Sequence, residues 1–535
     1  MILLGWLLAG SLAFGLASLL VLWSYGRFAR RARGQHSTAI PPGSDAPLDR
    51  LTLPAERRAD EAATVVPGPT DPGAASGLAL VDDGHSAFRL RVLAARSARR
   101  SLDIVTYIWR DDLSGRLLAL ELLEAADRGV RVRLLLDDAQ ALGFDRKYLG
   151  LNAHANIEVR LFNPIRARRT AVGRGFELLL SAVRFNRRLH CKAWIADGRL
   201  AIAGGRNVSD NDFALVRQMS RPGRDIDLLM AGATVREAAA LFDAHWNGGM
   251  ALPISALWSG WIADQRYRDR LYDARMRDGA RTLLAPLSTL NRSGAGPRSN
   301  LPLVREARPG LEGAVAALRW STGARLIADP PEKALGLNRD SWMPRTLRAL
   351  MLSARSELQI VTPYFVPGDE GAEDLMQLAR SGVRVEVLTN ALDATNHGIV
   401  HGAYRSYRAQ LLAAGVLLRE FAPPRGAMGR GEMLHAKAMI IDHRVGFVGS
   451  FNFDLRSAFL NAEMGVVFDD PLLLADLVQS VAMLSGSDMS WRLSLERGRV
   501  IWERAGQTAT HDPGAPALRR GLSWIVGHLP IHSHL

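Results

Sequence analysis

Two short segments of the chain carry the same reactive side chains at the same spacing. The segments are HCKAWIADGRLAIAGGRN (190–207) and HAKAMIIDHRVGFVGSFN (435–452). Lysine and asparagine suit phosphate oxygens, and histidine can act as a nucleophile or general acid near neutral pH. One such motif arises easily by accident, but two matched copies indicate a phosphate-handling site. Its candidate residues are His190, Lys192, Asp197 and Asn207 in the first copy, and His435, Lys437, Asp442 and Asn452 in the second.

The same spacing argues against a metal centre. A lysine two residues from each histidine repels a cation, and no carboxylate stands at ligand spacing beside the pair. We therefore expect neither a metal nor another cofactor at this site.

Each segment has the pattern of two strands joined by a tight turn. Residues 197–199 (Asp-Gly-Arg) and 442–444 (Asp-His-Arg) are turn formers between apolar runs. With 198 and 199 as the turn, Asn207 faces His190 and Gly205 faces Lys192. In the second copy, Asn452 then faces His435 and Ser450 faces Lys437. Asp197 and Asp442 fall at the turn, where we expect them to hold the hairpin together without touching substrate.

The duplication extends beyond the motifs. SARRSLDIVT (97–106) recurs as SARSELQIVT (353–362), and DRGVRVRLLLDD (127–138) as RSGVRVEVLTN (380–390). Helical patterns alternate with apolar β-branched runs in both copies, which predicts an α/β fold with a largely parallel sheet covered by helices on both faces.

Composition narrows the class of partner. The 535 residues include 67 Lys and Arg against 54 Asp and Glu, a net charge of 67 − 54 = +13. This excess predicts an anionic partner, with the phosphate of a lipid headgroup or a nucleic acid as the leading candidate. The single cysteine, Cys191, excludes an intrachain disulfide framework and any zinc module built on several cysteines.

The two ends of the chain point to a membrane. Residues 1–26 carry no charged side chain, and arginines follow at 27, 30, 31 and 33. Length and flanking charge favour a membrane-spanning anchor over a cleaved signal, and the positive-inside rule leaves the rest of the chain cytoplasmic. We expect residues 27–75 to form a basic juxtamembrane segment and a flexible linker. Residues 511–535 combine basic and aromatic residues, which suits either a lipid interface or packing on the body.

The duplicated H-x-K-x4-D motif resembles that of the phospholipase D superfamily. Further segments resemble its cardiolipin synthase branch, most of all the C type: TYIWRDDLSGRLL (106–118), FNRRLHCK (185–192), YFVPGDE (364–370), LTNALDATNHGIVHGAY (388–404) and WRLSLERGRVIW (491–502). The resemblance implies two α/β/α lobes, residues 76–314 and 315–510, related by a pseudo-twofold axis and sharing one active site.

The resemblance also implies roles. His190 is the expected nucleophile, forming a phosphohistidine, and His435 the acid and later the base, although the pseudo-symmetry leaves this order open. Lysines and asparagines of both motifs hold the phosphate oxygens. A carboxylate downstream of each motif orients its histidine, and the aligned sequences RDID and LNAE supply Asp227 and Glu463. The first copy has Gly205 where the second has Ser450, which resembles the C-type pattern. Arg187 and Arg188 offer a second anionic contact, or merely a solvated basic surface.

The expected activity is cardiolipin synthesis by transfer of a phosphatidyl group from phosphatidylglycerol or phosphatidylethanolamine to phosphatidylglycerol. A phospholipase D that hydrolyses phospholipid to phosphatidate uses the same residues and is the nearest alternative. A nuclease is disfavoured by the anchor and by the lack of a recognisable nucleic-acid-binding module. A non-catalytic lipid-binding scaffold is disfavoured by two complete motifs. The expected partners are phospholipid substrates and a membrane, with no nucleic acid; the sequence specifies no partner protein.

Overall fold

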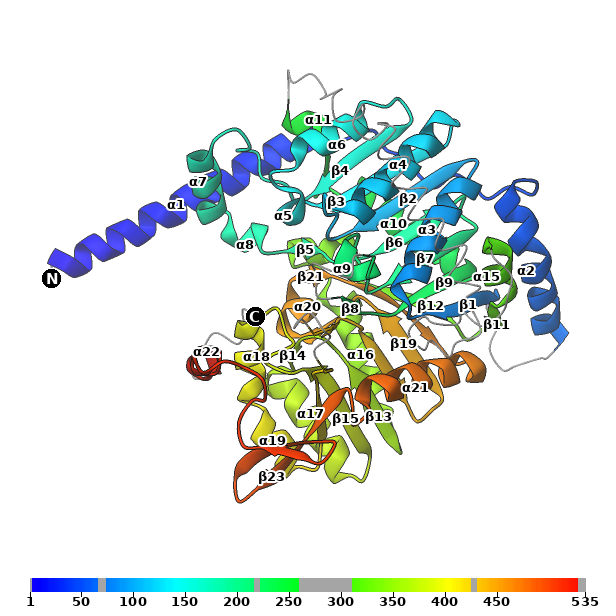
Figure 1. Ribbon diagram of the computed structural model, residues 1–535. Helices are drawn as coiled ribbons and strands as arrows, with labels where there is room; N and C mark the ends of the chain where they lie inside the picture. Colours follow the sequence, from blue (N-terminus) through cyan, green and yellow to red (C-terminus); the bar gives the residue numbers. More distant parts are fainter. Residues whose placement is uncertain (1, 66–73, 216–221, 259–309, 425–430, 528–535) are drawn as a thin grey trace.

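Two mixed β-sheets, one in each lobe, form the centre of the molecule (Figure 1). The computed structural model describes residues 2–65, 74–215, 222–258, 310–424 and 431–527. The first sheet has nine strands in the order β10-β4-β3-β2-β6-β7-β9-β1-β11, and the second has ten in the order β12-β22-β19-β18-β13-β15-β16-β23-β24-β25. Three further strand pairs, β14-β20, β17-β8 and β21-β5, lie outside these sheets.

The strands have the following bounds. In the first lobe they are β1 Ser76–Val81, β2 Ser101–Thr106, β3 Arg131–Asp137, β4 Ile157–Phe162, β5 Arg188–Leu189, β6 Ala193–Ala196, β7 Leu200–Gly204, β8 Gly223–Arg224, β9 Asp227–Gly232, β10 Ala251–Pro253 and β11 Arg319–Ser321. In the second they are β12 Arg325–Ala328, β13 Glu357–Val361, β14 Phe365–Val366, β15 Arg384–Asn390, β16 Leu417–Phe421, β17 Met433–Leu434, β18 Ala438–Ile441, β19 Val445–Gly449, β20 Phe453–Asp454, β21 Asn461–Ala462, β22 Met464–Phe468, β23 Ser490–Glu496, β24 Arg499–Arg504 and β25 Gln507–Ala509.

The two sheets repeat one strand order. The run β4-β3-β2-β6-β7-β9 of the first sheet matches β16-β15-β13-β18-β19-β22 of the second. Within each run only the first three strands are parallel; the hairpin and the strand after it run antiparallel. The sequence expectation of an α/β repeat is confirmed. The expectation of a largely parallel sheet is wrong, because the motif hairpin enters each sheet antiparallel to its neighbours.

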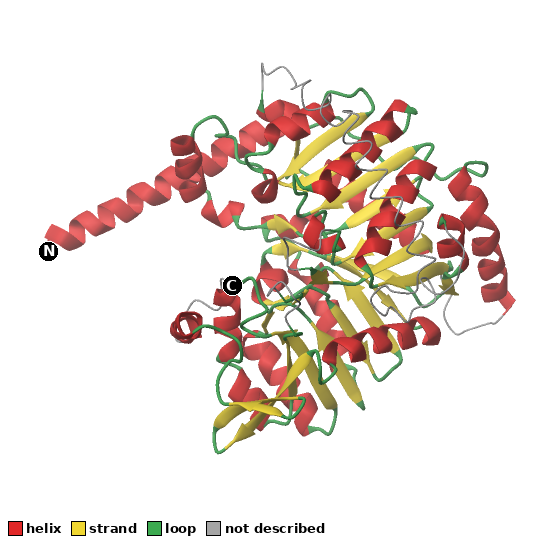
Figure 2. Ribbon diagram, viewed as in Figure 1, coloured by secondary structure: helices red, strands yellow, loops and turns green. Residues whose placement is uncertain are grey.

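Helices cover both faces of each sheet (Figure 2). The first lobe contains α3 Gly84–Ser97, α4 Leu113–Asp127, α5 Asp138–Ala141, α6 Asp145–Asn152, α7 Ala171–Leu180, α8 Ala182–Phe185, α9 Asp210–Phe213, α10 Ala233–Asn247, α11 Ile254–Leu257 and α15 Leu311–Ala316. The second contains the 3₁₀ turns η1 Pro331–Leu335 and η2 Arg339–Ser341, and α16 Met343–Leu352, α17 Gly368–Arg380, α18 Gly398–Arg405, α19 Arg408–Ala413, α20 Leu455–Phe459 and α21 Pro471–Ser485.

A continuous apolar core joins the lobes. It combines side chains of α10, such as Phe242 and Trp246, with Leu477 of α21 and with strand residues from both sheets. Separate cores lie on the outer faces, under α3 and α4 in one lobe and under α16 and α17 in the other. Because burial of apolar surface is the main driving force for association of these layers, the shared core fixes the two lobes against each other.

The N-terminal segment differs from the expected linker. Helix α1 (Ile2–Arg31) contains the one stretch of the described chain that is long and apolar enough to cross a membrane. The chain then lies on the first lobe, where Arg133 donates to the Ser37 carbonyl at 2.9 Å. Helix α2 (Pro47–Val65) follows, and its buried Asp49 accepts hydrogen bonds from Arg100 and Arg199. The expectation of a flexible linker is therefore wrong for residues 32–65, because their polar groups pair with the lobe; residues 66–73 lie outside the described residues.

The lobe boundary and the tail are also defined. Strand β11 pairs with β1 and β12 pairs with β22, so the chain passes between the sheets over residues 322–324, slightly after the expected boundary at 314. The C-terminal helix α22 (Ala517–Gly527) contacts α18 of the second lobe. The approach is close: a Cβ on Gly402 of α18 would lie 2.8 Å from the Ser523 carbonyl oxygen.

Candidate active site

His190 and His435 each follow a short strand that pairs with the opposite lobe. Strand β5 runs parallel to β21, and β17 runs parallel to β8. The backbone N–H of His190 donates to the Ala462 carbonyl at 2.8 Å, and that of His435 donates to the Arg224 carbonyl at 2.7 Å. These hydrogen bonds hold both histidines at the boundary between the lobes.

Each histidine is held by a carboxylate of the other lobe. His190 Nδ1 lies 2.7 Å from Glu463 Oε2, and His435 Nδ1 lies 2.6 Å from Asp225 Oδ2. Glu463 directly follows β21 and Asp225 directly follows β8. The cross-lobe strand pairs therefore position each histidine and its carboxylate together. A carboxylate on Nδ1 fixes the tautomer and leaves Nε2 for a substrate.

This crossed pairing corrects the assignment made from the sequence. There each histidine had a carboxylate from its own copy, Asp227 for the first and Glu463 for the second. Glu463 instead binds the first histidine. Asp227 binds neither; it is buried in an ion-pair network, 2.9 Å from Arg91 and 3.5 Å from Arg206. Sequence reasoning missed Asp225.

Strand register explains the error. Gly205 N donates to the Ile226 carbonyl at 3.2 Å, and Ser450 N donates to the Met464 carbonyl at 2.8 Å. The residue before each of these acceptors is the matching carboxylate, which makes Asp225 the true counterpart of the glutamate in the second copy. RDID carries an aspartate at both positions, so the sequence contained the right residue but no means of choosing it.

Burial favours a neutral imidazole at position 190. Burial lowers the pKa of His190 to about 4. Burial alone would raise the pKa of Glu463, but the His190 imidazole, the Lys192 ammonium and the Ser450 hydroxyl more than offset it and lower that pKa to about 2. A neutral imidazole against an ionised carboxylate is the protonation state of a nitrogen nucleophile.

The two motif lysines lie beside their histidines. Lys192 Nζ donates to the His190 carbonyl at 2.7 Å, and Lys437 Nζ donates to the His435 carbonyl. Burial lowers the pKa of both, that of Lys192 to about 8. Lys192 is therefore still cationic near neutral pH, and the two amine groups lie where an anionic phosphate can sit.

The motif hairpins differ from the expected register by one residue. Ala193 pairs with Ala203, and the second copy repeats this offset. The turn residues with positive φ are Asp197 (52°) and Gly198 (62°), one position earlier than expected. The expectation that Asn207 faces His190 and Asn452 faces His435 across the hairpin is therefore wrong, because the turn begins one residue sooner.

The motif asparagines lie just beyond these hairpins and are buried. Asn207 Oδ1 accepts from the Ile108 backbone N–H at 3.3 Å. Asn452 Oδ1 is buried with no hydrogen-bond partner among the described residues. An unpaired buried amide oxygen is costly, and such an acceptor fits a hydroxyl or another donor group of a ligand.

Gly205 and Ser450 support the two carboxylates differently. A Cβ at Gly205 would lie 2.1 Å from Asp225 Oδ1, so this position has no room for a side chain. Ser450 Oγ instead donates to Glu463 Oε2 at 2.5 Å. Both residues thus contact the carboxylate that holds a histidine. Their direct contact with substrate stays a prediction.

Asp197 and Asp442 tie each hairpin turn to the neighbouring strand. Asp197 accepts from the backbone N–H groups of residues 99–101 at the start of β2. Asp442 does the same for residues 355–357 at the start of β13. Backbone hydrogen bonds lower the pKa of Asp442 to about 2. Both aspartates therefore anchor the hairpin to the sheet.

Arg187 and Arg188, just before the first histidine, have protein partners. Arg188 is buried, 3.1 Å from Asp137, and its guanidinium stacks on Phe185 at 3.8 Å. Arg187 donates to the Lys333 carbonyl at 2.9 Å. Their role as a second anionic contact stays a prediction, and the paired Arg188 is the less available of the two.

An aromatic side chain completes the first half of the site. The Tyr107 ring meets the His190 imidazole edge-on with centroids 5.0 Å apart, and Lys192 Nζ lies 5.6 Å from its centroid. Tyr107 stands in the TYIWRDD segment, where the resemblance carried the only signal for it.

Three groups near His435 could in principle bind a cation. Ligand atoms of Asp212, Asp225 and His435 lie within 4.8 Å of one another. Asp225 already bonds His435, and Lys437 lies close enough to help lower the pKa of that carboxyl against the effect of its burial. The ammonium group supplies the positive charge that a metal would bring, so these residues fit an oriented histidine better than a metal centre.

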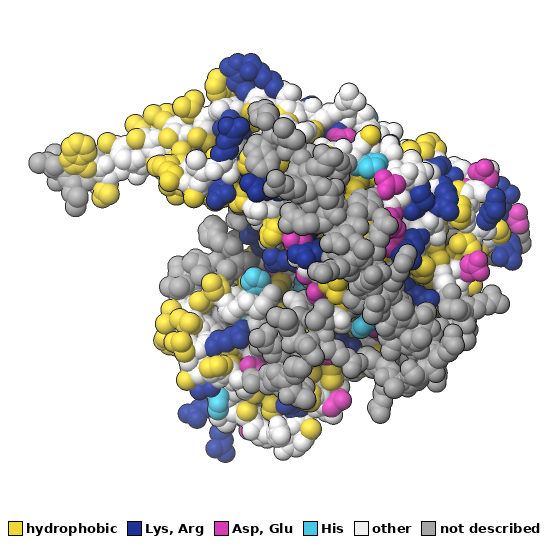
Figure 3. All heavy atoms as spheres, turned by 45° about the horizontal axis from the view of Figure 1, so that its top comes forward, with side chains coloured by type: hydrophobic (Ala, Val, Ile, Leu, Met, Phe, Trp, Pro, Cys, Tyr) yellow, Lys and Arg dark blue, Asp and Glu magenta, His cyan; other side chains and the backbone are white. Residues whose placement is uncertain are grey.

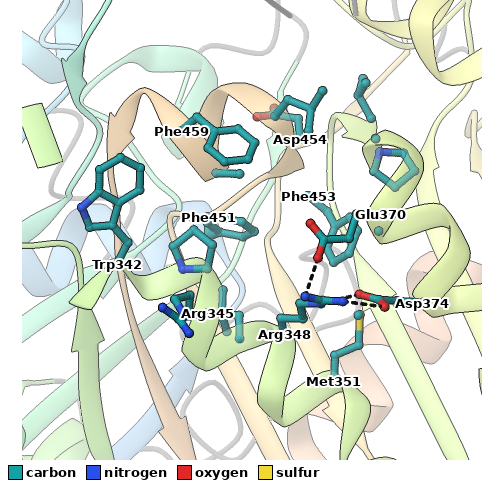
Figure 4. Close-up of a pocket in the computed structure, with 18 of the residues that line it drawn as sticks. Trp342, Arg345, Arg348, Met351, Glu370, Asp374, Phe451, Phe453, Asp454 and Phe459 are labelled. Atoms are coloured by element: carbon teal, nitrogen blue, oxygen red, sulfur yellow. Dashed lines mark hydrogen bonds and ion pairs between the residues drawn. The ribbon is translucent and has the colours of Figure 1, made fainter. Parts of the chain in front are cut away.

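A separate cavity of about 540 Å³ lies in the second lobe, away from the reacting groups. Phe451 and Phe453, which flank Asn452, line it, and Arg348 bridges Glu370 and Asp374 on its wall (Figure 4). Neither motif histidine nor either motif lysine lines this cavity. Asn452 lies between β19 and β20, and the cavity beside it is not the reaction centre.

Known proteins resemble this chain in sequence and in fold. A family described as "Cardiolipin synthase, PLD-like domain" matches residues 93–246 and 347–484, one match in each lobe. Cardiolipin synthase C of Escherichia coli (strain K12) is 36% identical over 439 residues, which cover 80% of this chain and 88% of that protein.

The chain belongs to the cardiolipin synthase family. Cardiolipin synthase A of Cronobacter sakazakii is a more distant member, 27% identical over 71% of this chain and 63% of its own length. The fold also resembles the crystal structure of phosphatidylserine synthase from Haemophilus influenzae, with a TM-score of 0.53 at 13% identity, over 88% of this chain and 96% of that one. Members are phospholipase D-type phosphatidyltransferases, and membership together with the apolar helix α1 indicates membrane association.

Proposed function

We propose that this protein makes cardiolipin by transferring a phosphatidyl group to the glycerol hydroxyl of phosphatidylglycerol through a phosphohistidine at His190. The observation that carries the proposal is the crossed pair of histidines, each held at Nδ1 by a carboxylate of the other lobe. Two imidazoles held at Nδ1, with no partner of Nε2 in the described part of the chain and two buried lysines beside them, suit an in-line displacement at phosphorus.

In the first step His190 Nε2 attacks phosphorus. The N–P bond forms, the P–O bond to the headgroup alcohol breaks, and His435 gives its Nε2 proton to the leaving oxygen. Asp225 holds His435 at Nδ1, which leaves Nε2 as the atom that carries this proton. Lys192 and Lys437 stabilise the negative charge that develops on the nonbridging oxygens, with Asn207 and Asn452 as neighbouring hydrogen-bond donors.

In the second step the acceptor replaces the histidine. His435, now neutral, removes the proton from the acceptor hydroxyl, the new P–O bond forms, and the N–P bond breaks. Glu463 then again holds a neutral His190. Similarity to the C type supports phosphatidylethanolamine as donor, with ethanolamine as the leaving alcohol, and phosphatidylglycerol is the second candidate donor.

The sidedness of the protein is part of the proposal. Arg27, Arg30, Arg31 and Arg33 follow the apolar stretch, so we expect the lobes on the cytoplasmic face. Protease digestion of the lobes in inverted but not in right-side-out membrane vesicles would support this orientation, and the opposite pattern would reverse it.

The test supplies purified full-length protein with phosphatidylglycerol vesicles, with and without phosphatidylethanolamine, and identifies products by mass spectrometry. His190→Ala and His435→Ala serve as inactive variants, and His443→Ala as a control on an exposed histidine of the second hairpin turn. Cardiolipin from the wild type and the control alone supports the synthase. Dependence on phosphatidylethanolamine, with release of ethanolamine, identifies the donor.

Hydrolysis is the second candidate, because water can replace the lipid hydroxyl in the same second step. Phosphatidate without cardiolipin would make the protein a phospholipase D. No lipid product, together with cleavage of nucleic acid that requires His190, would make it a nuclease.

A further inference from the structure

Helix α7 has its apolar and acidic side chains on unexpected faces. Val172, Phe176 and Leu179 share one face at spacings of four and three residues, and all three are exposed. Glu177 points inward, where its carboxylate accepts hydrogen bonds from backbone N–H groups of residues 166 and 167. A helix bordered by water normally buries the apolar stripe and exposes the carboxylate.

Helix α22 repeats this inversion in the other lobe. Leu518, Leu522 and Ile525 are exposed at the same spacings of four and three, with Trp524 beside them. Ser523 is buried, and the face of α22 that carries it packs on α18. The helix is therefore attached to the body by its small polar face and presents its large apolar side chains outward.

The first of these faces is continuous with the apolar helix α1. Arg166 at the loop before α7 donates to Ser24 Oγ at 2.9 Å, and the Arg184 guanidinium of α8 lies 3.6 Å from the Tyr25 ring centroid. Helices α1 and α7 are in contact. Helices α7 and α8 therefore lie beside residues 24 and 25 of α1, near the end of its apolar stretch. If α1 spans a bilayer, this is the level at which α1 leaves the bilayer.

Both helices connect to segments that carry or approach the motif histidines. In the first lobe α7 and α8 lead through Asn186 directly to β5 and His190, and Arg456 of the second lobe donates to Asn186 at 2.7 Å. In the second lobe Arg519 of α22 donates to the carbonyl of Thr395, two residues before His397, whose pKa is lowered by burial and by nearby His435.

Exposed apolar side chains gather on this one side of the molecule. Helices α1, α7 and α22 lie along the same edge in Figure 1, and hydrophobic side chains cluster along that edge in Figure 3. Among the described residues beyond α1, the large apolar side chains that are at least half exposed lie on α7, α8, α22 and nearby segments, with Leu472 of α21 as the exception. They are Val172, Phe176, Leu179, Val183, Leu335, Leu337, Ile399, Phe459, Leu518, Leu522, Trp524 and Ile525.

We propose that α7 with α8 and α22 form a two-part lipid-contact surface that holds the boundary between the lobes, where the histidines lie, against the same bilayer that α1 spans. Arginines border both parts, Arg174 on one and Arg519 and Arg520 on the other, which suits anionic headgroups. Substrates then reach the histidines from the bilayer without crossing water. The surface is inferred from exposure and continuity with α1, and does not depend on which acceptor the phosphohistidine takes.

Site-specific labelling tests the surface. Single cysteines at Phe176 and Leu522 receive an environment-sensitive NBD dye in full-length protein reconstituted in vesicles of phosphatidylethanolamine and phosphatidylglycerol. Leu472→Cys is the matched control, since Leu472 is 57% exposed against 55% for Leu522 and 63% for Phe176. The native Cys191 is buried, so it competes little for the dye.

We expect blue-shifted emission and quenching by doxyl-labelled lipid at 176 and 522 but not at 472. Emission at 176 and 522 that matches the control would overturn the proposal. Blue-shifted emission without lipid quenching would also overturn it, in favour of a covering protein or a second copy of the chain.

Activity gives a second readout, which rests on the proposed function. Phe176→Asp and Leu522→Asp should lower cardiolipin formation from vesicles by about tenfold, while Leu472→Asp stays near wild type. Turnover of short-chain, monomeric phosphatidylglycerol should be unchanged in all three. Equal loss on both substrates would contradict a role in bilayer contact. A wild type that makes no cardiolipin would refute the proposed reaction, whereas the labelling result would still decide on the surface.

Discussion

The two lobes are built on one strand order, yet each holds the histidine of the other lobe with a different carboxylate. In the first lobe the carboxylate is Asp225, with a glycine beside it because a Cβ at Gly205 would lie 2.1 Å from its oxygen. In the second it is the longer Glu463, which receives a hydrogen bond from Ser450 at 2.5 Å. The short and long carboxylates each match the space left by the residue beside them.

The exchange of carboxylates between lobes has a consequence for stability of the site. Neither lobe contains a complete histidine–carboxylate pair, since His190 depends on Glu463 and His435 on Asp225. The catalytic unit is therefore assembled only when β5 and β17 pair across the boundary. Fold symmetry sets the positions, and small differences between the copies can divide the roles of nucleophile and acid.

Removal of either histidine should cause the largest loss of activity. His190→Ala should abolish the covalent intermediate and cardiolipin formation, because no N–P bond can form. His435→Ala removes only proton transfer, so we expect a loss of about 10²–10⁴-fold. A donor with a p-nitrophenol leaving group, which needs no proton, should still label His190 in this variant. Rapid alkaline quench and mass spectrometry of the peptide around residue 190 measure the label.

The outcome fixes the order of roles. A label on His435 in His190→Ala would exchange nucleophile and acid. Loss of the label in both variants, with folding retained, would mean that the two imidazoles act as one unit in the first step.

The aspartates at 225 and 227 should separate catalysis from stability. Asp225→Asn removes the charge that orients His435, and we expect kcat to fall by about 10²–10⁴-fold with folding retained. Asp227→Asn leaves Arg91 and Arg206 with less compensation in the core, and we expect a loss of about 3–5 kcal/mol in the free energy of unfolding. Denaturant titration and vesicle assays on the same preparations measure both. A larger loss of kcat in the folded Asp227→Asn protein would restore the assignment made from the sequence.

Substitution of Gly205 and Ser450 should show how differently the two copies support their carboxylates. Gly205→Ser forces Asp225 away from its place, and we expect about tenfold lower kcat together with a destabilisation of about 1–3 kcal/mol. Ser450→Gly removes one hydrogen bond to Glu463 and should cost about 1–3 kcal/mol without a steric clash. Kinetics and thermal unfolding of the two variants measure these changes in kcat and stability. Gly205→Ser with wild-type kcat would show that the carboxylate has room to move.

The sequence was most informative where the repeat could be compared with itself. The duplicated segments predicted the α/β class, the two lobes and the motif residues, because matched spacing identifies matched positions. It was least informative about strand register. The hairpin turn was placed one residue too late, and Asp227 was aligned with Glu463 in place of Asp225, two residues earlier. Both errors came from counting residues along a single strand. Pairing between lobes has no local signal, so the crossing of Glu463 to His190 emerged only from the three-dimensional arrangement.

The N-terminal segment shows a second limit. Residues 27–75 read as a basic juxtamembrane segment and a flexible linker, because residues from about 35 to 75 are rich in Pro, Gly, Ala and Asp without a sustained apolar period. Asp49 and its neighbours instead complete a charge network with arginines of the first lobe. Whether a charged side chain is solvated or paired depends on a surface far away in sequence, which a local pattern does not contain.

The helix caps after the motifs give the smallest expected effect. Ser209 caps α9 and Asp454 caps α20 at equivalent positions, each accepting a hydrogen bond from a backbone N–H. Burial raises the pKa of Asp454 to about 7, above the value of about 3.9 for an unfolded chain. The folded state therefore binds this proton more tightly, and its contribution to stability is complete below about pH 4 and lost as the pH rises to about 7.

Asp454→Ser, which copies the cap of the first lobe, should remove that slope from the free energy of unfolding while Ser209→Ala leaves it in place. Denaturant titrations at pH 5 and pH 8 measure the difference. The variant should lose less stability at pH 8 than at pH 5, because a serine cap has no buried charge to solvate. An unchanged pH dependence would mean that Asp454 is ionised throughout, in which case the nearby Arg456 compensates its charge.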